Sequence, residues 1–188
     1  MIKLLIKPLA IIRAQEKINQ ITGLLKPRET ILDKGPGNGS VSHLLKQKGF
    51  NVEPIDVVDL SLYSDIKPKL YDGHRLPYAN DKYAVALLLT VLHHTQKPEQ
   101  VLLEATRVAK KVIIIEEIYN NYLHKLATFV IDGIFNLEFI GHPHSNKTDQ
   151  QWKKCFRENN LRLLSSSYSF SLWFLKRVTY VISKDQAL

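Results

Sequence analysis

Apolar residues recur along the chain with two spacings, one typical of amphipathic helices and one typical of buried strands. Residues 10–25 carry apolar side chains at mostly helical spacing, and the short apolar run at residues 30–33 predicts a strand. Helical spacing returns after residue 40, and residues 50–57 form a second strand-like run. The first part of the chain therefore predicts a helix, a strand, a glycine-rich turn, a second helix and a second strand.

The middle of the chain continues this alternation with longer apolar runs. Residues 83–92 (YAVALLLTVL) are almost continuously apolar, which is typical of a strand buried on both faces. Residues 98–109 predict a crossover helix with Pro98 near its start, and the β-branched run at 111–118 predicts another buried strand. An apolar stripe over residues 121–135 predicts a further helix.

The last part of the chain predicts a capped helix followed by two strands. Thr148 and Gln151 resemble a capping box that opens a helix around Trp152. Residues 161–170 and 177–183 suit an antiparallel pair at a sheet edge. Because strands alternate with helices, we expect a mostly parallel sheet with right-handed crossovers, which binds ligands at the carboxyl ends of its strands.

Composition narrows the class of protein. The chain has 188 residues, of which 45% are hydrophobic, and this suits one globular domain. Cys155 is the only cysteine, which excludes an intrachain disulfide and a cysteine-based metal cluster and favours a reducing, cytoplasmic setting. Lys3, Lys7 and Pro8 interrupt the apolar N-terminus, so we expect neither a signal peptide nor a continuous surface helix there.

The formal net charge of +8 permits nucleic acid, an anionic membrane surface or an acidic substrate as partner. The lysines and arginines are scattered along the chain, so solvated surface residues are the favoured interpretation. Peripheral membrane contact by residues 1–12 ranks below simple packing of this segment over the ligand site. The sequence indicates no DNA partner and no particular oligomeric state.

The glycine-rich turn ILDKGPGNGS at residues 31–40 follows the first predicted strand, where a backbone without Cβ atoms can approach a ligand. A dinucleotide fingerprint would need a glycine or an alanine at Ser40, and Asp33 would face the negative pyrophosphate. An acidic residue at this position suits a cationic or zwitterionic ligand instead.

The pattern D-x-G-x-G-x-G, formed by Asp33, Gly35, Gly37 and Gly39, resembles the first motif of class I S-adenosylmethionine-dependent methyltransferases, small-molecule type, similar to methyltransferase domain 11. The resemblance spans residues 28–118 and includes the Val-Leu-His-His sequence before a proline-started helix. It implies a Rossmann-like, doubly wound α/β fold. The implied sheet has seven strands, is mostly parallel, carries an antiparallel C-terminal edge strand and has helices on both faces.

The resemblance also implies S-adenosyl-L-methionine as cofactor and assigns residues to it. Asp56, at the end of the second strand, would accept hydrogen bonds from the ribose hydroxyls, with Asp59 as the fallback. Asp72 would accept from the adenine amino group, and Gly73 would add a backbone contact. The full cofactor-binding set is Asp33, Gly35, Gly37, Gly39, Asp56, Asp72, Gly73 and Thr90.

We expect one methyltransferase domain over residues 1–188, in four parts. These are an N-terminal helical cap (1–27), a cofactor-binding core (28–118), a helical substrate-lid insertion (119–150), and a C-terminal helix with edge strands (151–188).

Methyl transfer asks little of side chains beyond alignment, and a general base only where the acceptor loses a proton. His93 and His94 are the catalytic candidates, although a structural role ranks higher for each. Glu116 and Glu117 either orient the acceptor or cap backbone groups. In the predicted lid, Tyr119, Tyr122 and His142 are the substrate candidates. His142 and His144 lack an acidic or cysteine neighbour, so no metal site is predicted.

The expected activity is methylation of a small, apolar or aromatic acceptor. Three departures from the family pattern leave a catalytically inactive binding protein as an alternative: Ala84, Lys34, and the absence of Pro-Gly-Gly after residue 108. We expect the Lys34 side chain to point away from the cofactor. An RNA methyltransferase is a second alternative, disfavoured because no Asn-Pro-Pro-Tyr-type motif is present. A nicotinamide-dependent oxidoreductase is disfavoured by Asp33 and Ser40.

Overall fold

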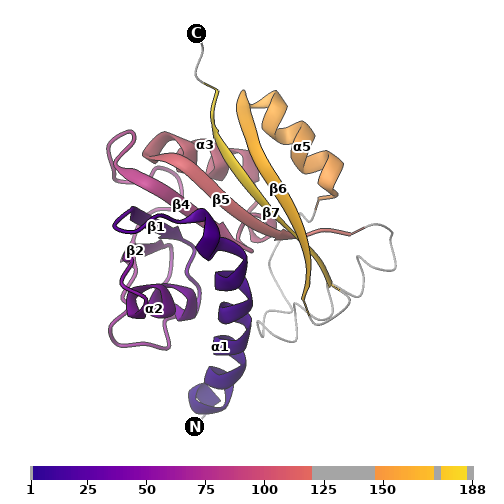
Figure 1. Cartoon of the computed structure of the whole chain (residues 1–188). Helices are drawn as coiled ribbons and strands as arrows, with labels where there is room; N and C mark the ends of the chain where they lie inside the picture. The colour runs from indigo at the N-terminus through magenta and orange to yellow at the C-terminus, as the bar shows by residue number, and fades with distance from the viewer. Residues whose placement is uncertain (1, 120–146, 172–174, 186–188) are drawn as a thin grey trace.

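A seven-stranded sheet forms the centre of the computed structural model, which describes residues 2–119, 147–171 and 175–185. The strands of this described part are β1 (Thr30–Lys34), β2 (Asn51–Asp56), β3 (Lys69–Leu70), β4 (Tyr83–Leu89), β5 (Ala109–Glu117), β6 (Leu161–Ser171) and β7 (Leu175–Lys184). They lie in the order β3-β2-β1-β4-β5-β7-β6 (Figure 1). The chain therefore reverses its direction of winding between β1 and β4, where α/β sheets bind ligands.

Strand directions confirm the expected sheet. β1 pairs in parallel with β2 and β4, and the β2–β3 and β4–β5 pairs are also parallel. β7 is antiparallel to both of its neighbours, β5 and β6. The antiparallel C-terminal strand thus lies one place in from the edge, and β6 forms the edge itself.

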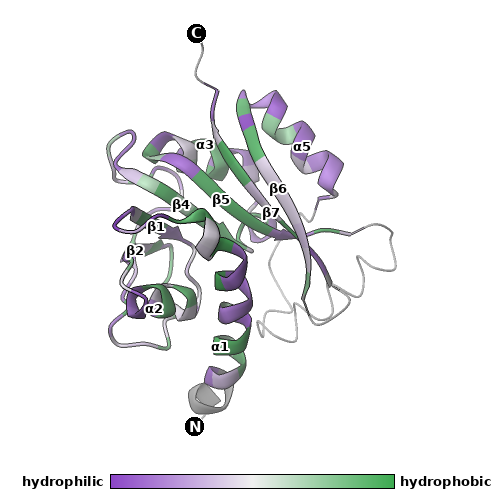
Figure 2. Cartoon of the chain, viewed as in Figure 1, coloured by the Kyte–Doolittle hydropathy of each residue, from purple (hydrophilic) through white to green (hydrophobic). Residues whose placement is uncertain are grey.

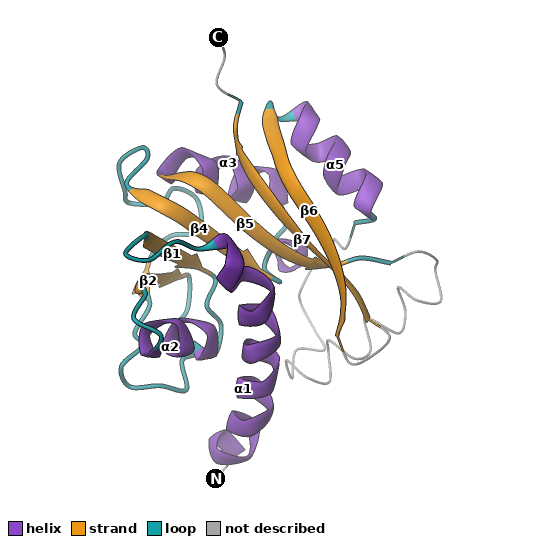
Figure 3. Cartoon of the chain, viewed as in Figure 1, coloured by secondary structure: helices purple, strands orange, loops and turns teal. Residues whose placement is uncertain are grey.

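Helices cover both faces of the sheet, as predicted (Figure 3). α1 (Ile2–Ile21) and α2 (Ser40–Gln47) lie on one face, and α3 (Pro98–Val108) and α5 (Asp149–Glu158) on the other. Successive strand residues point to opposite faces, so Ile31 packs with the α1 side while Leu32 packs with the α3 side. β4 and β5 are hydrophobic over much of their length because both of their faces are covered (Figure 2).

The first helix is longer than the sequence predicted. α1 begins at Ile2 and continues through Pro8, so the expectation that Pro8 interrupts a continuous helix is wrong. Proline removes one backbone N–H donor, and here the loss falls near the start of a helix of 20 residues. The buried residues Ala14, Ile18 and Ile21 then hold the rest of α1 against the sheet.

Part of the predicted lid lies outside the described residues, including the helix at 121–135, Tyr122, His142 and His144. Among the described residues, no helix is both long and apolar enough to span a membrane.

The capping box of α5 is confirmed and gives a stability prediction. Thr148 Oγ1 accepts from the backbone N–H of Gln151 at 3.3 Å, and Gln151 Oε1 accepts from the backbone N–H of Thr148 at 2.8 Å. Thr148→Ala leaves a helical N–H without its cap and is expected to lower the free energy of unfolding by about 1 kcal/mol. Urea denaturation measures this change. Gln150→Ala, at an exposed position of the same turn, is the control, and equal losses would contradict the capping role.

Candidate active site

A turn of residues 35–39 connects β1 to α2 at the carboxyl end of β1. The Gly35 N–H donates to the carbonyl of Ile55 in β2 at 2.9 Å, and the Gly39 N–H donates to the carbonyl of Pro36 at 3.0 Å. Gly35, Gly37 and Gly39 have φ angles of 76°, 54° and 77°. Residues with a Cβ rarely adopt such angles, so the turn itself requires glycine at these places.

The three glycines differ in what surrounds them. A Cβ on Gly35 would lie 2.7 Å from a methyl group of Val91, and a Cβ on Gly39 would lie 2.7 Å from Ser61 Oγ. A Cβ on Gly37 would meet no atom of the described part of the chain within 4 Å. Gly35 and Gly39 are therefore needed for close packing within the protein, whereas Gly37 presents open backbone that a ligand can approach.

Asp56 lies beside this open backbone. It ends β2, as predicted, and its Oδ1 accepts from the N–H of Val57 at 2.7 Å. Partial burial raises the pKa of Asp56, while backbone hydrogen bonds from Val57, Gly37 and Val58 oppose this rise. A carboxylate offers about four lone-pair sites, so after these three N–H groups at least one site remains for a ribose hydroxyl.

The loop after β3 brings a second acid to the same place. Leu70 pairs in register with Asp56, and a Cβ on Gly73 would lie 3.2 Å from the side chain of Val57. Asp72 is exposed, and backbone hydrogen bonds from His74 and Arg75 hold its pKa below the usual value. Val57, 56% exposed, thus lies between two acids and offers an apolar surface for a ring.

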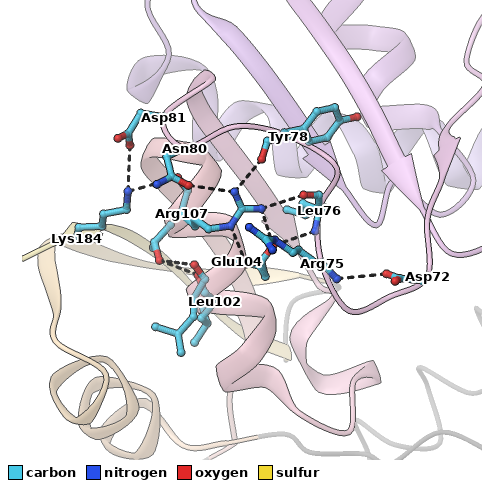
Figure 4. A network of polar contacts seen from close by, with 12 residues as sticks. Asp72, Arg75, Leu76, Tyr78, Asn80, Asp81, Leu102, Glu104, Arg107 and Lys184 are labelled. Carbon is cyan, nitrogen blue, oxygen red and sulfur yellow. Dashed lines mark hydrogen bonds and ion pairs between the residues drawn. The ribbon is translucent and has the colours of Figure 1, made fainter.

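Sequence reasoning missed Val57, although its position directly after a strand-end acid was a usable signal. It also missed the side chain that holds the Asp72 loop, Arg107 of α3 (Figure 4). The Arg107 guanidinium donates to the carbonyl of Tyr78 at 2.7 Å and to the carbonyl of Leu76 at 2.9 Å, and its Nε donates to Glu104 at 2.8 Å. These hydrogen bonds therefore hold residues 76–80 against α3.

Asp33 and Lys34 point to opposite faces of the sheet. Asp33 is 2% exposed and accepts a hydrogen bond of 2.6 Å from Ser42 Oγ of α2, and burial raises its pKa to about 6. The Lys34 ammonium lies 5.7 Å from the ring centroid of Tyr71, and burial lowers its pKa to about 8. Lys34 therefore points away from Asp33, although its charge still acts on Asp56.

Thr90, directly after β4, has a strained backbone. Its φ is 62°, its N–H donates to the carbonyl of Ile115 at 2.7 Å, and its Oγ1 accepts from Lys17 Nζ of α1 at 2.7 Å. A β-branched residue at positive φ costs on the order of 1–3 kcal/mol, and such strain clusters at functional sites. Thr90 is thus held by two elements at the edge where the glycine turn lies.

Glu116 organises the turn that follows Thr90. Its fully buried carboxylate accepts from the N–H groups of Val91 and Leu92, at 3.1 and 2.8 Å, and from His93 Nδ1 at 2.6 Å. His93 is 2% exposed, and its ring centroid lies 4.1 Å from that of half-buried His94. Glu116 therefore caps backbone groups, one of its two predicted roles, and also fixes the His93 ring.

The structure brings most of the predicted site residues to one edge of the sheet. They are Asp33, Gly35, Gly37, Gly39, Asp56, Asp72, Gly73, Thr90, His93 and His94, and they follow or end β1, β2, β3 and β4. Tyr119 is half-buried and lies two residues beyond β5, whereas Tyr122 and His142 fall outside the described residues. The described part of the chain holds no group of three or more side chains suited to a metal ion.

Comparison with known proteins identifies the family to which the chain belongs. A family model described as a methyltransferase domain matches residues 10–166. The chain belongs to this methyltransferase family. It is an enzyme, and S-adenosylmethionine is its cofactor. No curated protein sequence matches the chain significantly.

Solved structures of low sequence identity share the fold of this methyltransferase. A putative methyltransferase from Bacillus halodurans C-125 is 13% identical, with 90% of this chain and 97% of that chain covered and a TM-score of 0.67. A SAM-dependent methyltransferase from Methanosarcina mazei is 17% identical, with coverages of 87% and 96% and a TM-score of 0.66. Magnesium protoporphyrin IX methyltransferase from Synechocystis PCC 6803, solved with bound SAH, is 16% identical, with coverages of 93% and 84% and a TM-score of 0.65.

Two of the departures from the family pattern lie away from the site. Ala84 is near the amino end of β4, where its N–H donates to Thr30 Oγ1 at 3.1 Å. The missing Pro-Gly-Gly leaves α3 running directly into β5 at Ala109, also at the amino edge of the sheet. Neither departure reaches the residues around Gly37, so neither removes a predicted cofactor contact.

The residues present fit the cofactor. S-adenosylmethionine is a nucleoside with a cationic sulfonium, and the open backbone at Gly37 lies beside the Asp56 carboxylate, which can accept from a ribose hydroxyl. Val57 would pack against the adenine ring, and Asp33 adds negative charge behind the turn.

Gly37 and Gly49 make a matched pair for testing this fit. Both have positive φ, 54° and 83°, and an added Cβ at either would meet no atom of the described residues within 4 Å, but Gly49 lies beyond the end of α2. Alanine at either position is expected to lower the free energy of unfolding by about 1–2 kcal/mol through backbone strain. Only Gly37→Ala is expected to weaken binding of S-adenosylhomocysteine, measured by isothermal titration. Equal affinities in the two variants would count against Gly37 as a cofactor contact.

Asp33 predicts a pH dependence of stability. Its pKa rises from 3.8 to about 6 on folding, so its ionisation opposes the folded state. Protonated Asp33 stabilises the folded state fully below pH 3.8, and this stabilisation is lost as the pH rises through about 6. The free energy of unfolding is expected to fall by about 3 kcal/mol over this range. Asp33→Asn is expected to remove this part of the slope in urea denaturation between pH 4 and pH 7, whereas exposed Asp59→Asn keeps it. An unchanged slope in Asp33→Asn would contradict the burial effect.

Proposed function

We propose that this methyltransferase transfers a methyl group from S-adenosylmethionine to a small, apolar or aromatic acceptor by in-line displacement. When bound, the cofactor supplies an electrophilic methyl group on a sulfonium. The protein then contributes binding, alignment and exclusion of water. The open backbone of Gly37 next to the Asp56 carboxylate is the observation that carries this proposal, because it offers a nucleoside both close approach and two acceptor oxygens.

Each cofactor residue has a role in this proposal. Asp56 accepts from the ribose hydroxyls, and Asp72 accepts from the adenine amino group. Gly37 and Gly73 offer backbone to the ligand, and Val57 packs on the ring. Gly35, Gly39, Asp33 and Thr90 act on the cofactor through the shape and charge of the turns that carry them.

The acceptor would bind on the α1 side of the same edge. Lys17 of α1 reaches across the end of β4 to Thr90 and to the carbonyl of Leu89, so α1 borders the place where the methyl group would lie. Tyr119 follows β5 at this edge. We assign Tyr119, Tyr122 and His142 to the acceptor pocket, in keeping with the apolar stripe that follows Tyr122 in sequence.

His94 is our candidate for proton removal where the acceptor must lose a proton. Its ring is half-buried and lies against His93, and the buried Glu116 carboxylate fixes His93. His93 would therefore position His94 without touching the acceptor. An acceptor that reacts through a lone pair needs no base, and there His94 would serve only as part of the pocket wall.

Two alternatives lack a specific observation in their favour. An RNA methyltransferase is motivated only by the net charge of +8. An inactive binding protein is weakened by the placement of Ala84 and the α3–β5 junction away from the site. Incubation of cell extract with the enzyme and methyl-labelled cofactor, followed by mass spectrometry, separates all three outcomes by the class of molecule that gains label.

Titration with S-adenosylhomocysteine tests the cofactor assignment. Asp56→Asn is expected to weaken binding about 10- to 100-fold, because a charge-assisted hydrogen bond contributes about 1.5–3 kcal/mol. Asp59→Asn changes an exposed acid three positions away and is expected to bind like the wild type. Absence of binding by the wild type, or equal binding by both variants, would overturn the assignment.

A further inference from the structure

A fully buried arginine lies between α1 and the last strand, opposite the carboxyl end of β5. Arg177 of β7 pairs in register with Glu117, and its side chain is 0% exposed. Its Nη2 donates to Glu117 Oε1 at 3.3 Å, and its Nη1 lies 3.5 Å from Glu16 Oε2 of α1. The guanidinium is therefore enclosed by the sheet on one side and by α1 on the other.

Two nitrogens of this guanidinium are incompletely satisfied. Nε and Nη1 have no hydrogen-bond partner among the residues that the structure describes, although both atoms are buried. Leaving a buried charged donor without an acceptor is costly, and such groups in native proteins often mark function. A guanidinium can only donate, so the missing partner must accept hydrogen bonds, and a planar oxyanion matches its geometry best.

The surroundings of Arg177 are also biased toward positive charge. Arg13 Nη2 lies 3.8 Å from Glu117 Oε1, so two arginines share that carboxylate. The pKa of Lys17 shows which sign of charge prevails around it. Apart from burial, Arg177 and Arg13 lower the pKa of Lys17 more strongly than Glu117 and Asp33 raise it, and the pKa falls to about 8. An added anion would relieve this repulsion.

This cluster borders the proposed site for methyl transfer. Lys17 Nζ donates to Thr90 Oγ1 at 2.7 Å, and the next residue, Val91, packs against Gly35 of the glycine turn. The cationic cluster is therefore on the α1 side of the cofactor turn, where we place the acceptor.

We propose that Arg177, supported by Arg13, binds an oxyanion of the acceptor, a carboxylate or a phosphate. The inference rests on the proposed function, since it assigns a charged group to the acceptor of the same site. The Glu16 side chain is 36% exposed and its contact with Nη1 is long, so the oxyanion replaces Glu16 there while Glu16 turns to solvent. The acceptor would thus carry one acidic group on an apolar or aromatic body.

Benzoate, phenylphosphate and benzamide are suitable probes because they share a ring and differ in charge. Each is titrated into the full-length protein in the presence of saturating S-adenosylhomocysteine. We expect benzoate or phenylphosphate to bind at least about tenfold more tightly than benzamide, the contribution of one charge-assisted hydrogen bond. The better of the two anions identifies a carboxylate or a phosphate as the group. Equal binding of all three, or binding of none, overturns the proposal.

Variants separate anion binding from a purely structural ion pair. Arg177→Met is expected to abolish the preference for the anionic probe, while Arg162→Met, an exposed arginine on β6, keeps it. Glu16→Gln removes the competing carboxylate and is expected to tighten anion binding several-fold. If Arg177 only tethers α1, Glu16→Gln will lower the melting temperature without tightening anion binding, and that result overturns the proposal.

Two further readouts make the outcome decisive. Circular dichroism shows whether Arg177→Met folds, and if it does not, the Glu16→Gln titration alone decides. Binding of S-adenosylhomocysteine is recorded in the same samples. If the wild type binds the cofactor normally but does not discriminate between the probes, only the anion subsite is overturned, whereas absence of cofactor binding by the wild type overturns the proposed function.

Discussion

The geometry of the site depends on the hydrogen bonds that the buried carboxylate of Glu116 accepts. It accepts from two backbone N–H groups and from His93, and so fixes the turn that follows β4. The same turn places Val91 against Gly35, which sets how closely the glycine turn approaches β4. A single side chain of β5 thereby fixes the spacing between the cofactor turn and the histidines. A shorter or uncharged residue there would leave several buried donors without a partner.

Features that follow from local chemistry were predictable from the sequence. Buried strands were visible as apolar runs, the α5 cap as Thr148 with Gln151, and the end of β2 as Asp56. Long-range contacts were not predictable. Helix α1 continues through Pro8, and only the fold shows this. Glu116 and Glu117 look equivalent in sequence, yet strand alternation turns one toward the histidines and the other toward Arg177.

The end of β1 carries two neighbouring buried residues of opposite charge. Asp33 and Lys34 are both buried, and burial pushes the two pKa values toward neutrality from opposite sides, to about 6 and about 8. The strand separates them onto different faces, so they do not neutralise each other. A neutral hydrophobic pair of similar volume would avoid the desolvation cost of both charges.

The contacts between α1 and β7 tie together the two most distant parts of the chain. Gln20 and Thr179 are 159 positions apart, and Glu16 and Arg177 make a similar long-range pair. During synthesis, the strands up to β5 can pair before β7 leaves the ribosome, but α1 cannot find its ionic partners until then. The apolar face of α1 can therefore pack on β1, β4 and β5 as soon as these strands form, whereas its ionic contact with Arg177 is completed only when β7 is added to the sheet.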